Sequence, residues 1–149
     1  MFGTASKDRL DFVKSFGASE VFDYRNTDME NWVEGSEGRK FDVVIHTFGL
    51  QALTDAWYLV KDGGTLISFF QPPEDARPEG LTTRDVKALF FIVKTLGEHA
   101  GRVGDLIDGG GFVTIVDSVW PLENFEEAVE RMESGKARGK VVIEFVPET

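Results

Sequence analysis

The sequence predicts an α/β fold in which helices flank a mostly parallel sheet. Two observations carry this prediction: strand-like and helix-like segments alternate along the chain, and two of the strands are apolar almost throughout. Continuous apolar runs are typical of strands that are buried on both faces, as in parallel sheets. A length of 149 residues fits one domain, which we expect to span residues 1–149.

Helices are predicted where apolar residues recur every three or four positions. The first covers residues 6–16, where Ser6 can cap the amino end and Gly17 stops the helix. The same spacing predicts further helices over 28–34, 50–59, 98–107 and 121–132.

Strands are predicted where β-branched and aromatic residues cluster. The two most apolar clusters cover 41–48 and 65–70, and these are the strands expected to be buried on both faces. Shorter strands are predicted over 21–24, 89–93, 112–119 and 139–146. Glycine, proline and charged residues predict a turn over 61–64 and irregular loops over 34–40 and 71–80.

Composition excludes several classes of function. A net charge of −10 argues against binding to nucleic acid or to anionic lipid. Without cysteine the chain has no disulfide framework, thiolate nucleophile or zinc ribbon, and two histidines alone do not build the usual zinc site. Apolar runs of about five to seven residues are too short to cross a bilayer. No secretory signal is evident at the amino end, so a soluble, cytoplasmic protein is expected.

Four segments follow one another in an order that is informative. The first contains GTAS and then GASEVFDYR, over residues 3–25. The second reads FDVVIHTFG, the third contains GGTLIS, and the fourth joins WPL to SGKARGKVV. In order and spacing they resemble the cofactor domain of the medium-chain dehydrogenase/reductase superfamily. The zinc-free, quinone-oxidoreductase-like branch of these zinc-binding dehydrogenase-like proteins is the most similar.

The resemblance implies a truncated, Rossmann-like doubly wound sheet. The family's catalytic domain is missing from this sequence, as are the first strand of the cofactor domain and its glycine-rich G-x-G-x-x-G turn. That first strand is central in a doubly wound sheet, so its absence leaves two neighbouring strands without a partner. The sheet must therefore re-pair, take a strand from elsewhere, or form one piece of something larger.

The resemblance also implies a partner. The sixth strand of the family commonly pairs across a dimer axis, and residues 89–93 match it. We therefore expect a homodimer formed by pairing of this Leu89–Val93 edge strand. The alternative is a second chain that completes the sheet.

The first candidate site lies after the strand that contains GTAS. By resemblance, Thr4, Ser6, Lys7 and Tyr24 surround the adenosine 2′-phosphate of NADP. Hydroxyls and an ammonium group at the start of a helix suit a phosphate. An NAD-type site would instead need an acidic residue there, and none is present. The alternative is that Ser6 only caps the helix and Lys7 is solvated.

The second candidate site follows the strand over 41–48. Ligands of open α/β sheets bind at the carboxyl ends of strands, and by resemblance Thr47, Phe48 and Gly49 line the cofactor. His46 stands where the family often has Asp, and it is the candidate acid or base. The alternative is a partly buried histidine bonded to a backbone carbonyl.

The remaining candidates are aromatic side chains and one lysine. By resemblance, Phe69, Phe70 and Phe91 lie on the nicotinamide side of the cofactor, and Lys140 approaches it. The thirteen phenylalanines also offer walls for a hydrophobic small-molecule ligand. The alternatives are core packing for the aromatic residues and a solvated turn for Lys140.

Three functions remain open at this point. The resemblance implies an NADP(H)-dependent oxidoreductase that passes hydride to an enone or a quinone. The second is a repurposed lyase, isomerase or cyclase that holds a hydrophobic small molecule in the old cofactor cleft and uses His46. The third is a non-catalytic, dimeric interaction domain.

Overall fold

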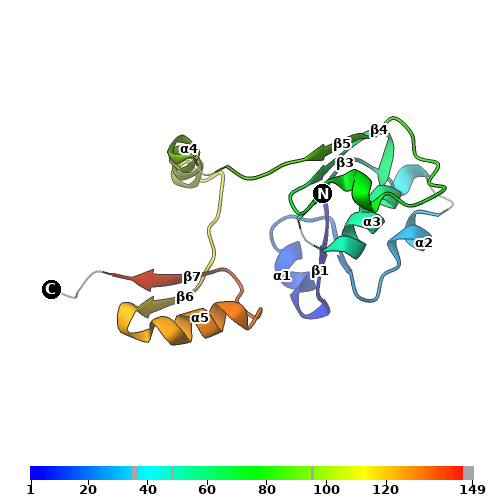
Figure 1. The fold of residues 1–149 in the computed structure, drawn as a ribbon. Helices are drawn as coiled ribbons and strands as arrows, with labels where there is room; N and C mark the ends of the chain where they lie inside the picture. The colour runs from blue at the N-terminus through cyan, green and yellow to red at the C-terminus, as the bar shows by residue number, and fades with distance from the viewer. Residues whose placement is uncertain (35–36, 48, 95, 146–149) are drawn as a thin grey trace. The chain divides into compact units, whose positions relative to one another are not determined.

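The computed structural model describes residues 1–34, 37–47, 49–94 and 96–145, which fall into two compact units, Met1–Val93 and Lys94–Thr149 (Figure 1). Helices and parallel strands alternate in both units, which confirms the predicted α/β class. The expectation of one domain over residues 1–149 stays a prediction. No helix in the described ranges is long and apolar enough to cross a membrane.

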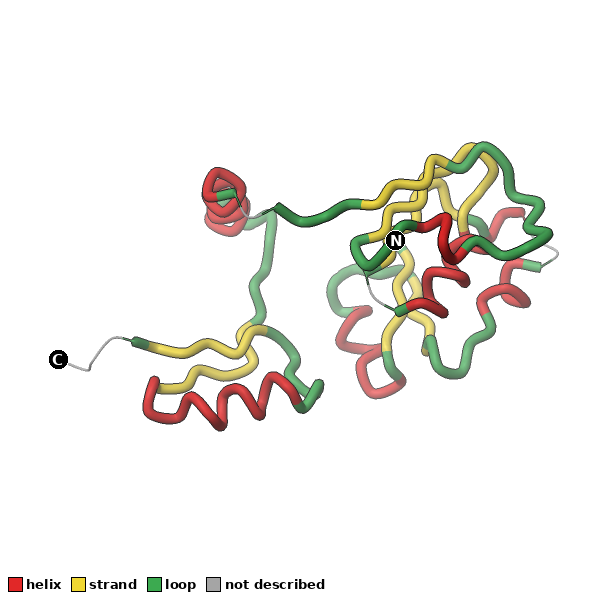
Figure 2. Tube along the Cα trace, viewed as in Figure 1, coloured by secondary structure: helices red, strands yellow, loops and turns green. Residues whose placement is uncertain are grey.

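The first unit holds two parallel sheets (Figure 2). One pairs β1 with β2, and the other has the strand order β3-β4-β5. Short 3₁₀ turns cover Lys7–Arg9, Glu37–Arg39 and Pro73–Ala76. The helices and strands are β1 (Phe2–Ala5), α1 (Leu10–Lys14), β2 (Glu20–Asp23), α2 (Met29–Val33), β3 (Phe41–His46), α3 (Leu50–Leu59), β4 (Val60–Ser68) and β5 (Lys87–Phe90).

The second unit contains one parallel strand pair, β6 with β7, and the helix α5 connects them (Figure 2). Two hydrogen bonds from the Arg131 guanidinium of α5 to the Asp117 carboxylate of β6, at 2.8 and 2.7 Å, join helix and strand. The elements are α4 (Gly97–Asp108), β6 (Val116–Pro121), a 3₁₀ turn (Leu122–Asn124), α5 (Phe125–Glu133) and β7 (Lys140–Glu144).

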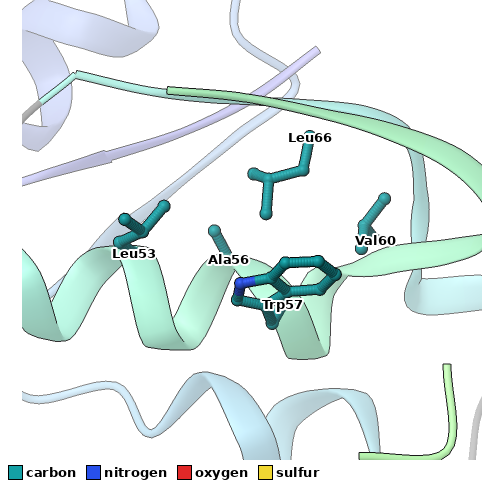
Figure 3. Packing of buried hydrophobic residues seen from close by; sticks show 5 residues of the cluster. All are labelled: Leu53, Ala56, Trp57, Val60 and Leu66. Carbon is teal, nitrogen blue, oxygen red and sulfur yellow. The ribbon is translucent and has the colours of Figure 1, made fainter. Parts of the chain in front are cut away.

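The core of the first unit lies between α3 and the sheet β3-β4-β5 (Figure 3). It consists of Leu53, Ala56 and Trp57 from α3 and of Val60 and Leu66 from β4. Burial of a large apolar side chain stabilises a fold by about 1.5–3 kcal/mol. The indole N–H of Trp57 donates to the Pro73 carbonyl at 2.9 Å, so the one polar atom of this side chain is also satisfied.

Residues 61–64 form a bulge within β4, and not the predicted turn. Phe41 pairs with Val60 but Val43 pairs with Thr65, so the extra residues of β4 are taken up opposite a single residue of β3. Gly63 has φ +69°, which glycine adopts without strain, and a Cβ on Gly64 would lie 2.8 Å from Val60 Cγ2. The two glycines therefore permit a bulge inside a continuous strand.

The strand over 41–48 ends at His46, and it is not buried on both faces as predicted. Val44 packs against the core beneath α3, whereas the side chains of Val43 and Ile45 on the other face are 56% and 62% exposed. Within the described part of the chain, β3 pairs only with β4. An apolar run therefore identified the strand but not the missing neighbour.

The strand predicted over 89–93 is shorter and begins earlier, at Lys87–Phe90. Its only described partner is β4, whose last paired residue is Ser68, opposite Phe90. A strand continues only as far as its neighbour offers backbone groups, so the pairing ends with the hydrogen bond from Phe91 N–H to the Ser68 carbonyl at 2.9 Å. For the same reason the strand predicted over 112–119 starts at Val116, opposite Lys140 at the beginning of β7.

Candidate cofactor site

A groove lies between the two sheets of the first unit. It encloses about 420 Å³ and is lined by residues of β1, β3 and α3, with contributions from β2 and the residues that follow it. Four of the predicted site residues line it: Thr4, Tyr24, His46 and Thr47. The structure therefore brings residues from the first and the second predicted site to one cavity.

At the first predicted site, the ends of β1 and β2 are joined. The backbone N–H of Tyr24, the first residue after β2, donates to the Ala5 carbonyl at 3.3 Å. Ser6 follows at the start of the 3₁₀ turn, but its side chain makes no capping hydrogen bond. Lys7 is exposed in that turn. The alternative in which Ser6 only caps the helix requires a capping hydrogen bond from its side chain, and this bond is not formed.

Arg25 is a cation beside the site that was not predicted from the sequence. Its guanidinium lies over the Tyr24 ring, 5.3 Å from the centroid. The Asp23 carboxylate holds the turn, since it accepts from the Arg25 backbone N–H at 3.1 Å and from Asn26 Nδ2 at 2.6 Å. The sequence contains a signal for this turn, because an Asp at the end of a strand commonly accepts a hydrogen bond from the backbone N–H two residues later.

Tyr24 also borders a second cavity, which is partly acidic. It encloses about 480 Å³ and is lined by Tyr24 and Arg25 and also by Asp28, Glu30 and Asp55. Hydrogen bonds from the backbone and side chain of Asn31 lower the pKa of Asp28, so this carboxylate is ionised at neutral pH. Asp55 also lines the groove, so a carboxylate borders both cavities beside Tyr24.

His46 is 5% exposed and makes two hydrogen bonds. Nε2 lies 2.8 Å from the Gly49 carbonyl and Nδ1 lies 3.1 Å from Ser68 Oγ. A carbonyl only accepts, so Nε2 carries the proton and Nδ1 accepts from the Ser68 hydroxyl. This is the geometry of the alternative in which a buried histidine is bonded to a backbone carbonyl. A catalytic role for His46 stays a prediction, and this arrangement does not favour it.

Three predicted aromatic residues lie near the carboxyl ends of β4 and β5, outside the lining of the groove. The rings of Phe69 and Phe91 meet edge to face at 5.8 Å, and Phe70 meets His46 in the same way at 6.1 Å. All three phenylalanines are between 40% and 56% exposed, more than core packing would require. Their backbones are nonetheless anchored, as in the 2.9 Å bond from Phe91 N–H to the Ser68 carbonyl.

Phe48 and Lys140 are the remaining predicted residues. Phe48 lies outside the described residues. Lys140 begins β7 in the second unit, where its backbone N–H donates to the Ile115 carbonyl at 2.8 Å and its side chain is exposed. Its predicted approach to the cofactor stays a prediction.

Comparison with known protein families identifies the family of this chain. The sequence model of the zinc-binding dehydrogenase family matches residues 16–143. The chain belongs to this family. The resemblance to the cofactor domain of the medium-chain dehydrogenases and reductases is therefore confirmed.

Among relatives, the chain is 44% identical over 146 residues to the "Probable zinc-binding oxidoreductase, mitochondrial" of Arthroderma benhamiae, covering 98% of this chain and 44% of the relative. It is 30% identical over 148 residues to a chloroplastic quinone-oxidoreductase of Triphysaria versicolor, covering 95% and 44%. The chain thus spans less than half the length of these curated relatives.

Solved structures show the same fold. An alcohol dehydrogenase superfamily protein from Novosphingobium aromaticivorans superposes with a TM-score of 0.71 at 21% identity, covering 95% of this chain and 47% of that chain. A structure titled as the CurK enoyl reductase gives 0.69 at 19% identity, covering 95% and 46%. At this identity the likeness concerns the fold alone.

The residues of this chain do not fit the zinc that the family name implies. Zinc sites are built mainly from cysteine and histidine, and the sequence has no cysteine and two histidines. Among the residues that the structure describes, no three His, Asp or Glu side chains gather in a way that could hold a metal ion. No chemical step is therefore assigned to zinc.

Proposed function

We propose that this chain forms the cofactor half of an NADP(H)-dependent oxidoreductase of the quinone oxidoreductase or enoyl reductase type. The observation that carries the proposal is the shared cavity, where Thr4 and Tyr24 from one sheet meet His46 and Thr47 from the other. Both pairs stand at the carboxyl ends of parallel strands, where open α/β sheets bind their ligands. Membership of a dehydrogenase family supports the same activity.

The proposed roles follow from the chemistry of each side chain. The cofactor, when bound, supplies the hydride. The hydroxyls of Thr4 and Ser6 and the ammonium of Lys7 would bind the 2′-phosphate, with Tyr24 against the adenosine. His46 would act as a positioning residue, because its two hydrogen bonds tie the segment after β3 to Ser68 at the end of β4.

Names of relatives guide the proposed substrate class. They include quinone oxidoreductases and an NADPH-dependent alkenal/one oxidoreductase of Arabidopsis thaliana. A quinone or an enone is therefore the proposed hydride acceptor, bound by polypeptide that these relatives carry beyond the matched region. Relatives carry mitochondrial and chloroplastic names, so the expected cytoplasmic location receives no support from them.

The two alternative functions receive less support. A lyase, isomerase or cyclase would need a proton-transfer group, and both ring nitrogens of His46 are engaged by Gly49 and Ser68. A purely non-catalytic dimer would not explain why Thr4, Tyr24 and Thr47, three of the predicted cofactor residues, line one cavity with His46.

Titration of the pure protein with NADPH and NADH, followed by calorimetry, tests the proposal. We expect NADPH to bind more tightly, and Lys7→Ala to weaken NADPH binding about tenfold while leaving NADH binding unchanged, as for one lost charge-assisted contact. Lys14→Ala is the matched control, since Lys14 is an exposed lysine at the carboxyl end of α1, where no phosphate contact is proposed. Absence of NADPH binding at millimolar concentration would refute the proposal.

A further inference from the structure

One buried hydroxyl lies where the strands of the sheet β3-β4-β5 end. Ser68 is the last residue of the central strand β4, and its register partners are His46 and Phe90, the last residues of β3 and β5. Ser68 is 0% exposed. A hydroxyl at such a position is costly unless hydrogen bonds compensate for the loss of water. The bonds that it makes therefore indicate what a polar residue contributes at the end of this apolar strand.

The hydrogen-bonding capacity of this hydroxyl is fully used. Ser68 Oγ accepts from the main-chain N–H groups of Phe70 and Gln71, at 3.3 and 3.4 Å. Its own proton goes to His46 Nδ1 at 3.1 Å, because Nε2 of the ring donates to the Gly49 carbonyl. A hydroxyl has one proton and two lone pairs, so three bonds saturate it. Of the two neutral forms of the imidazole ring, only the one protonated at Nε2 satisfies both residues.

The same hydroxyl sets the path of the chain that leaves β4. Three consecutive main-chain N–H groups are engaged there. The N–H of Phe69 donates to the His46 carbonyl at 3.0 Å, and those of the next two residues donate to Ser68 Oγ. On the other edge of β4, the Ser68 carbonyl accepts from Phe91 N–H at 2.9 Å. Ser68 therefore joins the ends of all three strands.

These contacts reach the groove of the proposed cofactor site. His46 lines the groove, and its ring meets the Phe70 ring edge to face at 6.1 Å. Phe69 and Phe70 are 40% and 41% exposed, so both can contact a ligand at the carboxyl ends of the strands. Such a ligand would meet groups whose positions depend on Ser68, although Ser68 itself is fully buried.

We propose that Ser68 is a positioning residue for the nicotinamide half of the cofactor, and that it acts through His46 and through the main chain of residues 69–71. The inference rests on the proposed function and deepens it, since it assigns the alignment of the nicotinamide to a hydroxyl that the ligand does not touch. Binding to a wall that is already fixed costs less ordering than binding to a loose one. Loss of the hydroxyl should therefore weaken binding of the nicotinamide half and leave the adenosine half unchanged.

A purely structural role is the alternative, and the chain offers a second buried hydroxyl for comparison. Thr83 is 1% exposed, and its hydroxyl accepts from Lys40 Nζ at 3.2 Å. Lys40 and Thr83 precede β3 and β5, so this pair lies at the amino end of the sheet, opposite to Ser68. Removal of either hydroxyl takes a hydrogen bond from a buried group. Only removal of the Ser68 hydroxyl should affect the ligand.

Calorimetric titration of the full chain with NADPH and with adenosine 2′,5′-bisphosphate, which lacks the nicotinamide, separates the two roles. Ser68→Ala should weaken NADPH binding about tenfold and change bisphosphate binding by less than about twofold. Ser68→Thr keeps the hydroxyl and should restore NADPH binding. Thr83→Val is the matched control and should leave both affinities unchanged.

The ¹⁵N resonance of His46 Nδ1 gives a readout that needs no cofactor. In the unmodified protein it should have the position of an unprotonated nitrogen that accepts a hydrogen bond. Ser68→Ala should move it to the position of a nitrogen without this bond, and Ser68→Thr should return it. If Ser68→Ala does not fold, Ser68→Cys, whose thiol is a weak donor, should give intermediate values in both experiments.

The outcomes distinguish this inference from the proposed function. Unchanged NADPH binding in Ser68→Ala, or an equal loss of NADPH and bisphosphate binding, would overturn the inference alone. A His46 resonance that Ser68→Ala does not move would overturn it without any use of NADPH. Absence of NADPH binding by the unmodified protein would refute the proposed function and the inference with it.

Discussion

The two units contain the same local pattern, a helix between two parallel strands, but among the described residues only the first unit has a closed core. In the first unit, α3 buries Leu53, Ala56 and Trp57 against β4. In the second unit, α5 buries only Ala128 among its described residues, and Phe125 and Met132 are 51% and 59% exposed.

The difference comes from what lies beyond the helix. In the first unit a third strand and the loop after β4 add half-buried apolar side chains to the core, namely Ala76, Leu81, Val86 and Ala88. The second unit has no comparable additional layer among its described residues, and an ion pair joins α5 to β6. A strand-helix-strand pattern therefore gives a stable core only when a further element covers it.

The largest expected effect tests the closed core. Trp57→Ala should lower the free energy of unfolding by about 3–5 kcal/mol, because it leaves a cavity beside α3. The control is Met132→Ala on exposed α5, with an expected change within about 0.5 kcal/mol. Urea denaturation monitored by circular dichroism measures both. Similar losses in the two variants would contradict the contrast between the units.

Sequence reasoning predicted elements best where the signal is local. The helix α3 has the predicted bounds, Leu50–Leu59, because Gly49 precedes it and its apolar residues recur with helical spacing. The predicted bounds of β5 were wrong, because the extent of this strand depends on where β4 ends, at Ser68. The predicted burial of Val43 and Ile45 was wrong, because burial depends on a neighbouring element that an apolar run cannot reveal.

The site was predictable to the same extent. The rule that ligands bind at the carboxyl ends of parallel strands selected His46, and the family resemblance selected Thr4, but that both line one cavity was not predicted. The hydrogen bond from Ser68 to His46 follows from the register of β3 with β4, and the packing of Arg25 on Tyr24 follows from a turn. Register and turn geometry were not contained in the motifs.

A smaller effect is expected from the ion pair of the second unit. Hydrogen bonds from the Arg131 guanidinium and the Arg138 backbone N–H hold the pKa of Asp117 well below its ordinary value. The pair therefore stabilises the fold in full above about pH 4, and this contribution is lost as the pH falls through the lowered pKa.

Asp117→Asn should lower the thermal midpoint at pH 7, and the difference from the unmodified protein should shrink at pH values below about 4. Asp105→Asn, at an exposed position of α4, should change the midpoint at neither pH. If the Asp117→Asn difference were independent of pH, the ion pair would not be what joins α5 to β6.

The smallest change in stability is expected at the edge of the first unit, where the predicted homodimer would form. Ile92 and Val93 are 69% and 73% exposed beyond the end of β5, so the edge has apolar side chains without cover. Ile92→Lys should dissociate the dimer in sedimentation and change the free energy of unfolding of the monomer by less than about 0.5 kcal/mol. Val113→Lys, at an equally exposed position of the second unit, should leave the oligomeric state unchanged. An intact dimer in Ile92→Lys would show that the open edge of the first unit, despite its exposure, is not the surface that pairs.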